Sequence, residues 1–542
     1  MTKKSKMKEE HVEKGLTRRS VLKGALTLSA VATGGGLPLT KAYVGTAEAK
    51  TPSEKPGGGR YTVGADEKEF CYLPALVLAD MVRRKKVSPV EVTKKFLERI
   101  DKINPQVNAF VTLVPEIALA AAKKAESAVM KKEKLGPLHG IPVGIKDVTV
   151  TKGIRTTFGS LLYKDYIPEQ DAIIVERLKR AGAIILGKTN TPEFAAGAST
   201  FNKVCGITRN PWNTDFNSGG SSGGSAAALA AGMLPVATGN DLGGSLRIPA
   251  SFCGVVGFRT SPGQVPGFPN DLNWDLLNIE GPMARTIGDI ALMLEVMAGP
   301  DDRCPISQQV PREGAEYLQS VRNPTIKKFR VAWSDSLGLT RVDTEVLKIA
   351  RGAMKVFENL GCQVEEAAPD FSRTRETALA LRGQRYVSLY QDQLDKNPNF
   401  RDLVNPLIIG NIESGLKLTI AEVARADRER SDLWNRVRTF FEKYDLLLTP
   451  TVPIPPFTAE TIFPKEINGV PMENYVDWAM LTYAFTMTGL PAISVPGGWT
   501  ENGLPVGIQI VGRRHQEATV LKGAAAYEKA APWINKKPPL KA

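Results

Sequence analysis

Short apolar runs with the character of strands alternate with helix-like segments along most of this chain. The runs 140–150 (GIPVGIKDVTV), 183–187 (AIILG), 444–453 (YDLLLTPTVP) and 490–498 (LPAISVPGG) have the β-branched or continuous apolar composition of buried strands. No polar linker separates these segments after about residue 60. The alternation therefore predicts one large α/β domain rather than two smaller domains.

One helix start is clearly marked in the stretch VSPVEVTKKFLERIDKI. Ser88 is a candidate N-cap, Pro89 takes the first helical position, and Glu91 completes a capping box. We therefore expect a helix that begins at Pro89.

The first 49 residues have the layout of an export signal. A basic opening leads to TRRSVLKG, the apolar stretch ALTLSAVAT follows, and AEA ends the segment as a small-x-small cleavage site. The pair Arg18 and Arg19, with its flanking residues, resembles the twin-arginine consensus. We predict a twin-arginine signal peptide over 1–49, a flexible linker over 50–60 and the folded domain over 61–542. Such a protein is expected in the periplasm or outside the cell.

The charge and composition of the mature chain argue against two classes of partner, nucleic acids and the membrane interior. The signal holds nine Lys or Arg and four Asp or Glu, so the net charge of +13 falls by 5 to +8 without it. No run of five basic residues follows Lys50, which argues against nucleic-acid binding. Residues 216–240 lack charge, but their Gly, Ser and Ala content is too weakly apolar for a membrane span.

The cysteines predict neither a zinc site nor a disulfide framework. They are odd in number and scattered, without C-x-x-C spacing, although one bridged pair remains open. Their positions are Cys71, Cys205, Cys253, Cys304 and Cys362.

The stretch SGGSSGGSAAALAAG at 218–232 is either a linker or a site. Gly/Ser composition alone favours a linker. However, an irregular segment, TRNPWNTDFN at 208–217, precedes the run, and its end is Ala-rich and helix-competent. The glycines therefore lie at a loop-to-helix junction, where backbone N–H groups point outward toward an anion.

Two motif matches offer other chemistry. GAIILGKT at 182–189 fits the phosphate-binding pattern, but its middle residues have the composition of a strand, so Lys188 is expected merely to follow that strand. GGSSG at 219–223 fits a nucleophile elbow that would pair Ser221 with His515. The elbow needs a preceding strand, whereas NTDFNS reads as irregular, and the arginine-flanked His515 is expected on the surface.

A third set of segments favours serine and lysine chemistry. PLHGIPVGIKD places Lys146 near the end of an apolar strand, where burial disfavours the ammonium form and leaves an amine base. TGNDLGGSLRIPA at 238–250 contains a second Gly/Ser turn, whose consecutive backbone N–H groups lie beside Ser245.

With these segments the chain resembles the amidase signature family over nearly all of its length after the signal. GGSSGGSAAALAAG followed by GNDLGGSLRIPA matches the family signature in residues and spacing, and PLHGIPVGIKD matches its lysine segment. The resemblance implies a large mixed sheet surrounded by helices, and hydrolysis of a small-molecule amide. Metal and organic cofactors are not expected, because the chain itself supplies the reacting groups.

The resemblance also implies the catalytic roles. Ser245 would be the nucleophile, Ser221 the bridging serine and Lys146 the base. Lys146 would take a proton from Ser221, which takes one from Ser245, and the alkoxide would attack the amide carbonyl to form an acyl-enzyme.

Further positions follow from the same resemblance. The peptide bond between Gly220 and Ser221 is expected to be cis. Ser222, Asp241 and Arg247 match positions that support the triad. The backbone N–H groups expected to hold the oxyanion are those of Leu242, Gly243, Gly244 and Ser245.

The motifs do not identify the amide. Members of the family act on free amides, fatty acyl amides, nylon oligomers and ureas, or serve as glutaminase subunits of amidotransferases. Export argues against the last role, because an exported protein does not meet charged tRNA. TPEFAAGAST at 191–200 corresponds to a pocket-lining stretch with room for an acyl group of moderate size. A non-catalytic exported binding protein is the alternative of another class, and a homodimer is a further expectation.

Overall fold

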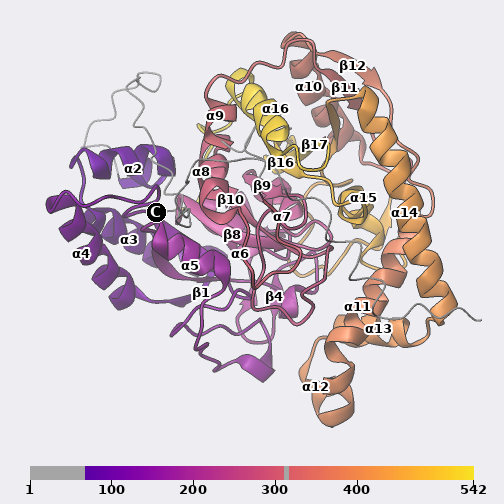
Figure 1. The fold of residues 1–542 in the computed structure, drawn as a ribbon, viewed down its shortest axis with the longest axis horizontal. Helices are drawn as coiled ribbons and strands as arrows, with labels where there is room; N and C mark the ends of the chain where they lie inside the picture. The colour runs from indigo at the N-terminus through magenta and orange to yellow at the C-terminus, as the bar shows by residue number, and fades with distance from the viewer. Residues whose placement is uncertain (1–66, 310–316, 542) are drawn as a thin grey trace, which may run out of the picture. The chain divides into compact units, whose positions relative to one another are not determined.

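One mixed sheet forms the centre of the computed structural model, which describes residues 67–309 and 317–541. Helices surround this sheet (Figure 1), which confirms the predicted α/β class. The described residues form a single compact unit. The predicted signal peptide at 1–49 and the linker at 50–60 lie outside the described residues.

The sheet has eleven strands. Their spatial order is β1 (Phe110–Leu113), β3 (Ile184–Thr189), β2 (Pro142–Lys146), β8 (Val236–Asp241), β10 (Ile279–Ala284), β9 (Val256–Arg259), β16 (Ala492–Trp499), β17 (Pro505–Gly512), β13 (Leu446–Pro450), β11 (Arg330–Trp333) and β12 (Gln363–Glu366). Three two-stranded ribbons pair β4 (Phe201–Asn202) with β5 (Gly206–Ile207), β6 (Arg209–Asn210) with β7 (Asn213–Asn217), and β14 (Glu466–Ile467) with β15 (Val470–Pro471).

The α-helices surround the sheet (Figure 1). They are α1 (Glu67–Cys71), α2 (Ala75–Arg83), α3 (Pro89–Val107), α4 (Pro115–Met130), α5 (Ile173–Arg180), α6 (Gly223–Ala230), α7 (Arg247–Cys253), α8 (Ile287–Met297), α9 (Tyr317–Arg322), α10 (Thr344–Asn359), α11 (Thr374–Lys396), α12 (Phe400–Leu403), α13 (Pro406–Leu416), α14 (Ile420–Lys443), α15 (Met480–Thr488) and α16 (Glu517–Ala530). Short 3-10 turns occur at η1 (Leu161–Tyr163), η2 (Glu193–Ala195) and η3 (Asp477–Ala479). None of the described helices is long and apolar enough to cross a membrane.

The predicted helix start and strands are present, with altered ends. Ser88 caps α3, because its side chain accepts from the Glu91 N–H while Glu91 accepts from the Ser88 N–H. β2 ends at Lys146, so the predicted strand 140–150 was too long. β3 continues to Thr189.

The segment before the Gly/Ser run corrects a second expectation. Residues Asn213–Asn217, interpreted from the sequence as irregular, form β7. The strand pairs with β6 in a ribbon outside the main sheet, and Phe216 also forms an antiparallel bridge with Thr458. A sequence rich in Asn and Asp adopts a strand here because β6 on one side and residues 457–459 on the other satisfy its backbone, which outweighs the low strand propensity of those residues.

Parallel pairing brings the chemically important segments to one edge of the sheet. β2 runs parallel to β8, with Val143 opposite Val236 and Gly144 opposite Ala237. The carboxyl ends of β2 and β8 therefore lie side by side. Lys146 ends β2, and β8 leads directly into the DLGGS turn.

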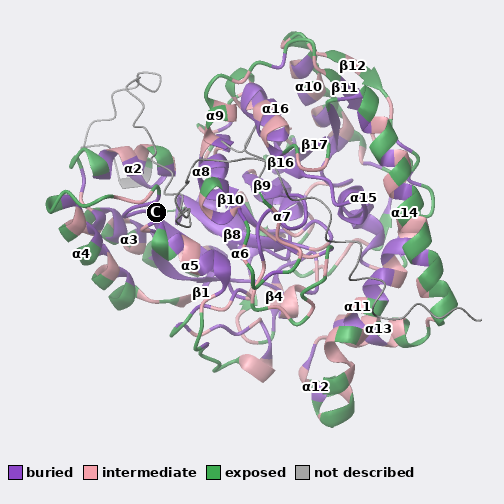
Figure 2. Ribbon diagram, viewed as in Figure 1, coloured by how far each residue is buried: buried purple, intermediate pink, exposed green. Residues whose placement is uncertain are grey.

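Helix α6 lies in the interior against this part of the sheet. Every residue of Gly223–Ala230 is buried, and Figure 2 shows buried residues concentrated in the central strands and helices. Small side chains allow the close approach: a Cβ on Gly224 would lie 2.2 Å from the Asn190 backbone nitrogen. The Gly/Ser run is thus a fixed junction at the start of a buried helix rather than a linker.

Candidate active site

Lys146 is fully buried at the end of β2 and lies among three side-chain oxygens. Its Nζ is 2.6 Å from Ser221 Oγ and 3.0 Å from Ser222 Oγ, and it also contacts Asn240 Oδ1. Ser221 and Ser222 come from the junction before α6, and Asn240 comes from β8. Three segments distant in sequence therefore meet at one amine.

The hydrogen-bond roles of these groups orient the amine. Asn240 Oδ1 is only an acceptor, so it takes one N–H of Lys146. Ser222 Oγ lies 3.4 Å from the Asn240 carbonyl oxygen, to which it donates, so it accepts a second N–H. In the neutral amine these two bonds use both protons. The remaining lone pair of Nζ then faces Ser221, which is the arrangement needed to accept its proton.

The electrostatic environment brings the Lys146 amine into the physiological range. Burial lowers the pKa of Lys146 to about 7, while the negative charges of Glu280 and Asp241 partly oppose this shift. A substantial fraction of the amine is therefore neutral near pH 7, although free lysine is almost fully protonated there.

Glu280 is a buried carboxyl neighbour that the sequence did not reveal. It lies on β10 directly opposite Asn240 on β8, and its Oε2 has no hydrogen-bond partner within the described residues. Burial raises the pKa of Glu280 to about 7, and the charges of Lys146 and Lys188 oppose that rise. Glu280 and Lys146 are thus coupled groups that titrate in the same range.

We expect Glu280→Gln to move the acid limb of the pH–rate profile to lower pH. Removing the carboxylate charge removes an interaction that raises the pKa of Lys146, so the amine stays neutral at lower pH. A shift of roughly half to one pH unit in kcat/KM is expected, by analogy with single charge neighbours. The exposed Glu133→Gln is the matched control. An unchanged acid limb in the Glu280 variant contradicts the coupling.

The serine junction and the DLGGS turn are joined by backbone contacts. The Gly220–Ser221 peptide bond is cis. The Ser222 N–H donates to the Ser245 carbonyl oxygen at 3.2 Å. Ser221 is fully buried, whereas Ser245 is partly exposed and lines a pocket. Ser245 is therefore the serine of this pair that a substrate reaches.

The turn before Ser245 presents three free backbone donors rather than the four predicted. The Gly244 N–H donates to Asp241 Oδ1 at 2.8 Å, so this amide is already used. The N–H groups of Leu242, Gly243 and Ser245 have no partner within the described part of the chain. The expected oxyanion donor set loses Gly244, because its N–H already donates to the Asp241 carboxylate.

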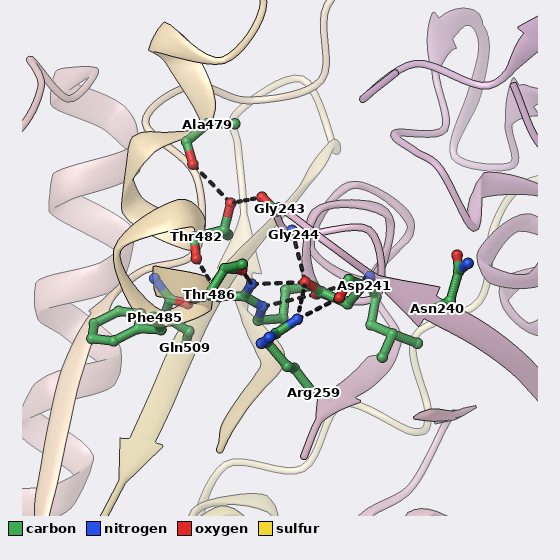
Figure 3. A network of polar contacts seen from close by, with 12 residues as sticks. Asn240, Asp241, Gly243, Gly244, Arg259, Ala479, Thr482, Phe485, Thr486 and Gln509 are labelled. Atoms are coloured by element: carbon green, nitrogen blue, oxygen red, sulfur yellow. Dashed lines mark hydrogen bonds and ion pairs between the residues drawn. The ribbon is translucent and has the colours of Figure 1, made fainter. Parts of the chain in front are cut away.

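A buried ion cluster holds the turn in place (Figure 3). The Asp241 carboxylate accepts from Arg247 Nε and Nη2, both at 3.0 Å, and from Arg259 Nη1 at 3.1 Å. It also accepts from the Leu246 N–H at 3.2 Å. Burial alone would raise the pKa of Asp241, but the two guanidinium groups hold it well below its usual range. Asp241 therefore remains charged.

Helix α15 clamps the same turn from the other side. Thr482 Oγ1 donates to the Gly243 carbonyl oxygen at 2.6 Å, and Arg247 Nη1 donates to the Thr482 carbonyl oxygen at 2.9 Å. The peptide between Gly243 and Gly244 is thus fixed at its C=O by Thr482 and at its N–H by Asp241 (Figure 3). This fixes the amides on either side of it.

A small pocket, partly open to solvent, is lined by Ser245. Small residues from the predicted pocket-lining stretch, Ala195, Gly197 and Ala198, form one wall. Two tyrosines, Tyr475 and Tyr483, also line the pocket, together with one cation, Arg382.

The competing motifs are not assembled into sites. The His515 ring lies 3.5 Å from the Gln264 side chain, and neither of its nitrogens contacts a serine hydroxyl in the described chain. Lys188 is inside β3 rather than after it, where its Nζ contacts the Thr149 carbonyl and Thr151 Oγ1. The phosphate-pattern residues therefore form a buried strand, not an anion-binding loop. No cluster of three or more His, Cys, Asp or Glu side chains suited to a metal occurs in the described ranges.

Sequence reasoning missed several residues of this site. Asn240 contacts Lys146, and Arg259 contacts Asp241. Thr482 donates to the Gly243 carbonyl of the oxyanion turn. Asn240 had a usable signal, because it immediately precedes the DLGGS turn. The others come from strands and helices far along the chain, and nothing in their local sequence marks them.

Comparison with known proteins gives a consistent result. A model of the family described as Amidase matches residues 91–521. An acylamidase of Rhodococcus erythropolis is 39% identical over 477 residues, which cover 87% of this chain and 98% of that protein. A glutamyl-tRNA(Gln) amidotransferase subunit of Moorella thermoacetica is 35% identical over 495 residues, which cover 87% of this chain and 99% of that protein.

Solved structures are similar over the same range. A bacterial aryl acylamidase of the amidase signature family superposes with a TM-score of 0.80 at 29% identity, covering 85% of this chain and 97% of that one. A 6-aminohexanoate cyclic dimer hydrolase gives a TM-score of 0.78 at 29% identity, covering 86% and 99%.

Proposed function

Because the chain belongs to the amidase family and is an amide-bond hydrolase, we propose that it works through an acyl-enzyme on Ser245. Ser221 and Lys146 form the proton relay in this proposal. The observation that carries it is the position of the Lys146 amine, 2.6 Å from Ser221 Oγ and held by Ser222 and Asn240 on its other sides.

The first half of the reaction forms the acyl-enzyme. Neutral Lys146 takes the Ser221 proton, Ser221 takes the Ser245 proton, and Ser245 Oγ bonds to the amide carbonyl carbon. The negative charge on the carbonyl oxygen is stabilised by the free N–H groups of the turn, those of Leu242, Gly243 and Ser245.

The second half releases both products. The C–N bond breaks as the proton held by Lys146 returns through Ser221 to the departing nitrogen, which leaves as ammonia or an amine. Water then attacks the ester on Ser245, with the same relay accepting its proton, and the carboxylic acid departs. Lys146 therefore acts as base and as acid in turn, a role that suits a pKa of about 7.

We propose acylated amines as the substrate class, since a pocket opens to solvent at Ser245 and an acylamidase is among the similar proteins. The test is release of 4-nitroaniline from 4-nitroacetanilide by the purified protein, followed by absorbance. Turnover by the chain alone separates this role from that of an amidotransferase component or a non-catalytic binding protein. Absence of turnover on a wider panel of anilides and primary amides would contradict the proposal.

We further propose export of the folded protein by the twin-arginine route, supported by TRRSVLKG and AEA in the first 49 residues. Replacing Arg18 and Arg19 by lysine is expected to leave the protein in the cytoplasm, because this route requires the arginine pair. Activity in whole-cell lysates should stay unchanged, since both residues precede the domain. The measurement is activity in separated periplasmic and cytoplasmic fractions, and equal export of the double variant counts against the signal.

A further inference from the structure

Arg382 is a buried cation without an anionic partner on the wall of the pocket that contains Ser245. It lies on α11, and no carboxylate of the described residues forms an ion pair with it. Its guanidinium donates instead to neutral groups: Nε to Asn411 Oδ1 at 2.8 Å, Nη1 to the Tyr483 hydroxyl at 2.9 Å, and Nη2 to the Tyr386 hydroxyl at 2.9 Å. Two of its five N–H donors remain unused.

Aromatic rings hold this guanidinium in place. It lies over the Tyr386 ring, 4.6 Å from the centroid, and over the Tyr475 ring, 4.9 Å from the centroid. The hydrogen bonds fix its plane as well. The cation is therefore preorganised, with little side-chain freedom left to lose when a ligand binds.

The hydroxyl groups around Arg382 add further donors. The Tyr475 side chain lines the pocket, and its buried hydroxyl has no hydrogen-bond partner among the described residues. The Tyr483 hydroxyl accepts from Arg382, and its own proton is not donated to any described group. Burial raises the pKa of Tyr483, so this phenol stays protonated. The wall thus offers a positive charge and unspent O–H groups.

This wall is directly connected to the reacting centre. A Cβ on Gly243 would lie 2.7 Å from the Tyr483 hydroxyl oxygen, so this phenol packs against the oxyanion turn. The remaining lining residues are mostly small or aliphatic and supply no carboxylate. When the carbonyl of a ligand lies at Ser245, another part of the same ligand therefore lies next to Arg382.

We infer that Arg382, with the Tyr475 hydroxyl, binds a carboxylate of the substrate, so that the preferred substrates are amides carrying an anionic group near the scissile bond. This inference rests on the proposed function and names the substrate class within it. A buried guanidinium without an anion is costly, and a carboxylate is the partner that its planar donors fit best. The free donors of Arg382 and the unpaired Tyr475 hydroxyl are both satisfied by such a ligand.

Matched substrate pairs test the inference. Glutaryl 4-nitroanilide carries a carboxylate on the acyl part, and 5-methylhexanoyl 4-nitroanilide replaces it by a neutral isopropyl group of similar shape. 4-Acetamidobenzoate and 4-isopropylacetanilide make the same comparison on the amine part. We expect the full-length wild-type protein to prefer the acid of at least one pair about 10- to 100-fold in kcat/KM, the range for a charged hydrogen bond.

Variants assign that preference to the pocket. Arg382→Met should reduce the acid-to-neutral ratio toward 1, and Tyr475→Phe, which keeps the ring, should lower it about three- to tenfold. Arg401→Met is the control, because Arg401 is exposed and forms an ion pair with Glu413, away from the pocket lining. If Arg382→Met does not fold, two other measurements test the carboxylate site. One is the acid-to-neutral ratio of kcat/KM in Tyr475→Phe. The other is whether the anionic glutarate inhibits the wild-type protein competitively more strongly than the neutral glutaramide does.

The outcomes separate this inference from the proposed function. Hydrolysis of both members of each pair at equal rates, or an unchanged ratio in both variants, overturns the carboxylate site while leaving the amidase reaction intact. Absence of hydrolysis of all four anilides by the wild-type protein contradicts the proposed function itself.

Discussion

Ser245→Ala is expected to lower kcat/KM for an acyl anilide by about 10⁴-fold or more, because it removes the serine hydroxyl that the pocket presents to a substrate carbonyl. The fold should be retained. Ser245 is partly exposed, and no side-chain hydrogen bond of its hydroxyl is lost in the described chain. Folding is checked by circular dichroism and thermal unfolding. The exposed Ser388→Ala is the matched control and should keep full activity.

A covalent probe identifies the nucleophile directly. An activated phosphonate should label the wild-type protein on Ser245 and leave the Ser245→Ala variant unlabelled, as read by peptide mass mapping. Labelling of Ser221 in the wild-type protein would falsify the assignment and restore the nucleophile-elbow alternative. In that case His515→Ala should be as damaging as Ser221→Ala.

Ser221→Ala is expected to lower kcat/KM less than Ser245→Ala does, because Ser245→Ala removes the nucleophile. The variant interrupts the proton path between Lys146 and Ser245 but keeps the attacking oxygen and the free amides of the turn. Water in the space left by the hydroxyl would carry part of the proton transfer. The two serine variants therefore differ in the size of their defects, although both lie in one relay.

The sequence predicted those parts of the molecule whose signals are local. The capping box placed the start of α3, apolar runs placed β3 and β13, and two Gly/Ser turns located Ser221 and Ser245. These signals need no knowledge of distant contacts. The strand ends were less accurate, because the end of a strand depends on pairing with neighbours rather than on its own residues.

Contacts between distant segments could not be predicted in the same way. Arg259 reaches Asp241 because β9 lies beyond β10 in the sheet, and Arg382 reaches the pocket because α11 packs on α15. Glu280 faces the Lys146 cluster only through the register of β10 against β8. The Gly244 N–H is a similar case, because only the position of the Asp241 carboxylate shows that this donor is already used.

Lys146 should govern the pH dependence of the reaction. The base form is the neutral amine, so kcat/KM follows the deprotonated fraction: it rises about tenfold per pH unit below the Lys146 pKa and reaches a plateau above it. Burial lowers that pKa to about 7, so the midpoint is expected near pH 7 rather than near the value of about 10.4 for free lysine.

Lys146→Ala should lower kcat/KM by several powers of ten and remove the acid limb, because Ser245 then keeps its ordinary, very high pKa and Ser221 has no acceptor for its proton. The measurement is a full pH profile of kcat/KM for the variant and for wild type. Lys152→Ala, an exposed lysine just beyond β2, is the control and should keep both the rate and the midpoint. An acid limb that persists with the same midpoint in Lys146→Ala would assign it to another group, with Glu280 the nearest candidate, and would remove Lys146 from the role of base.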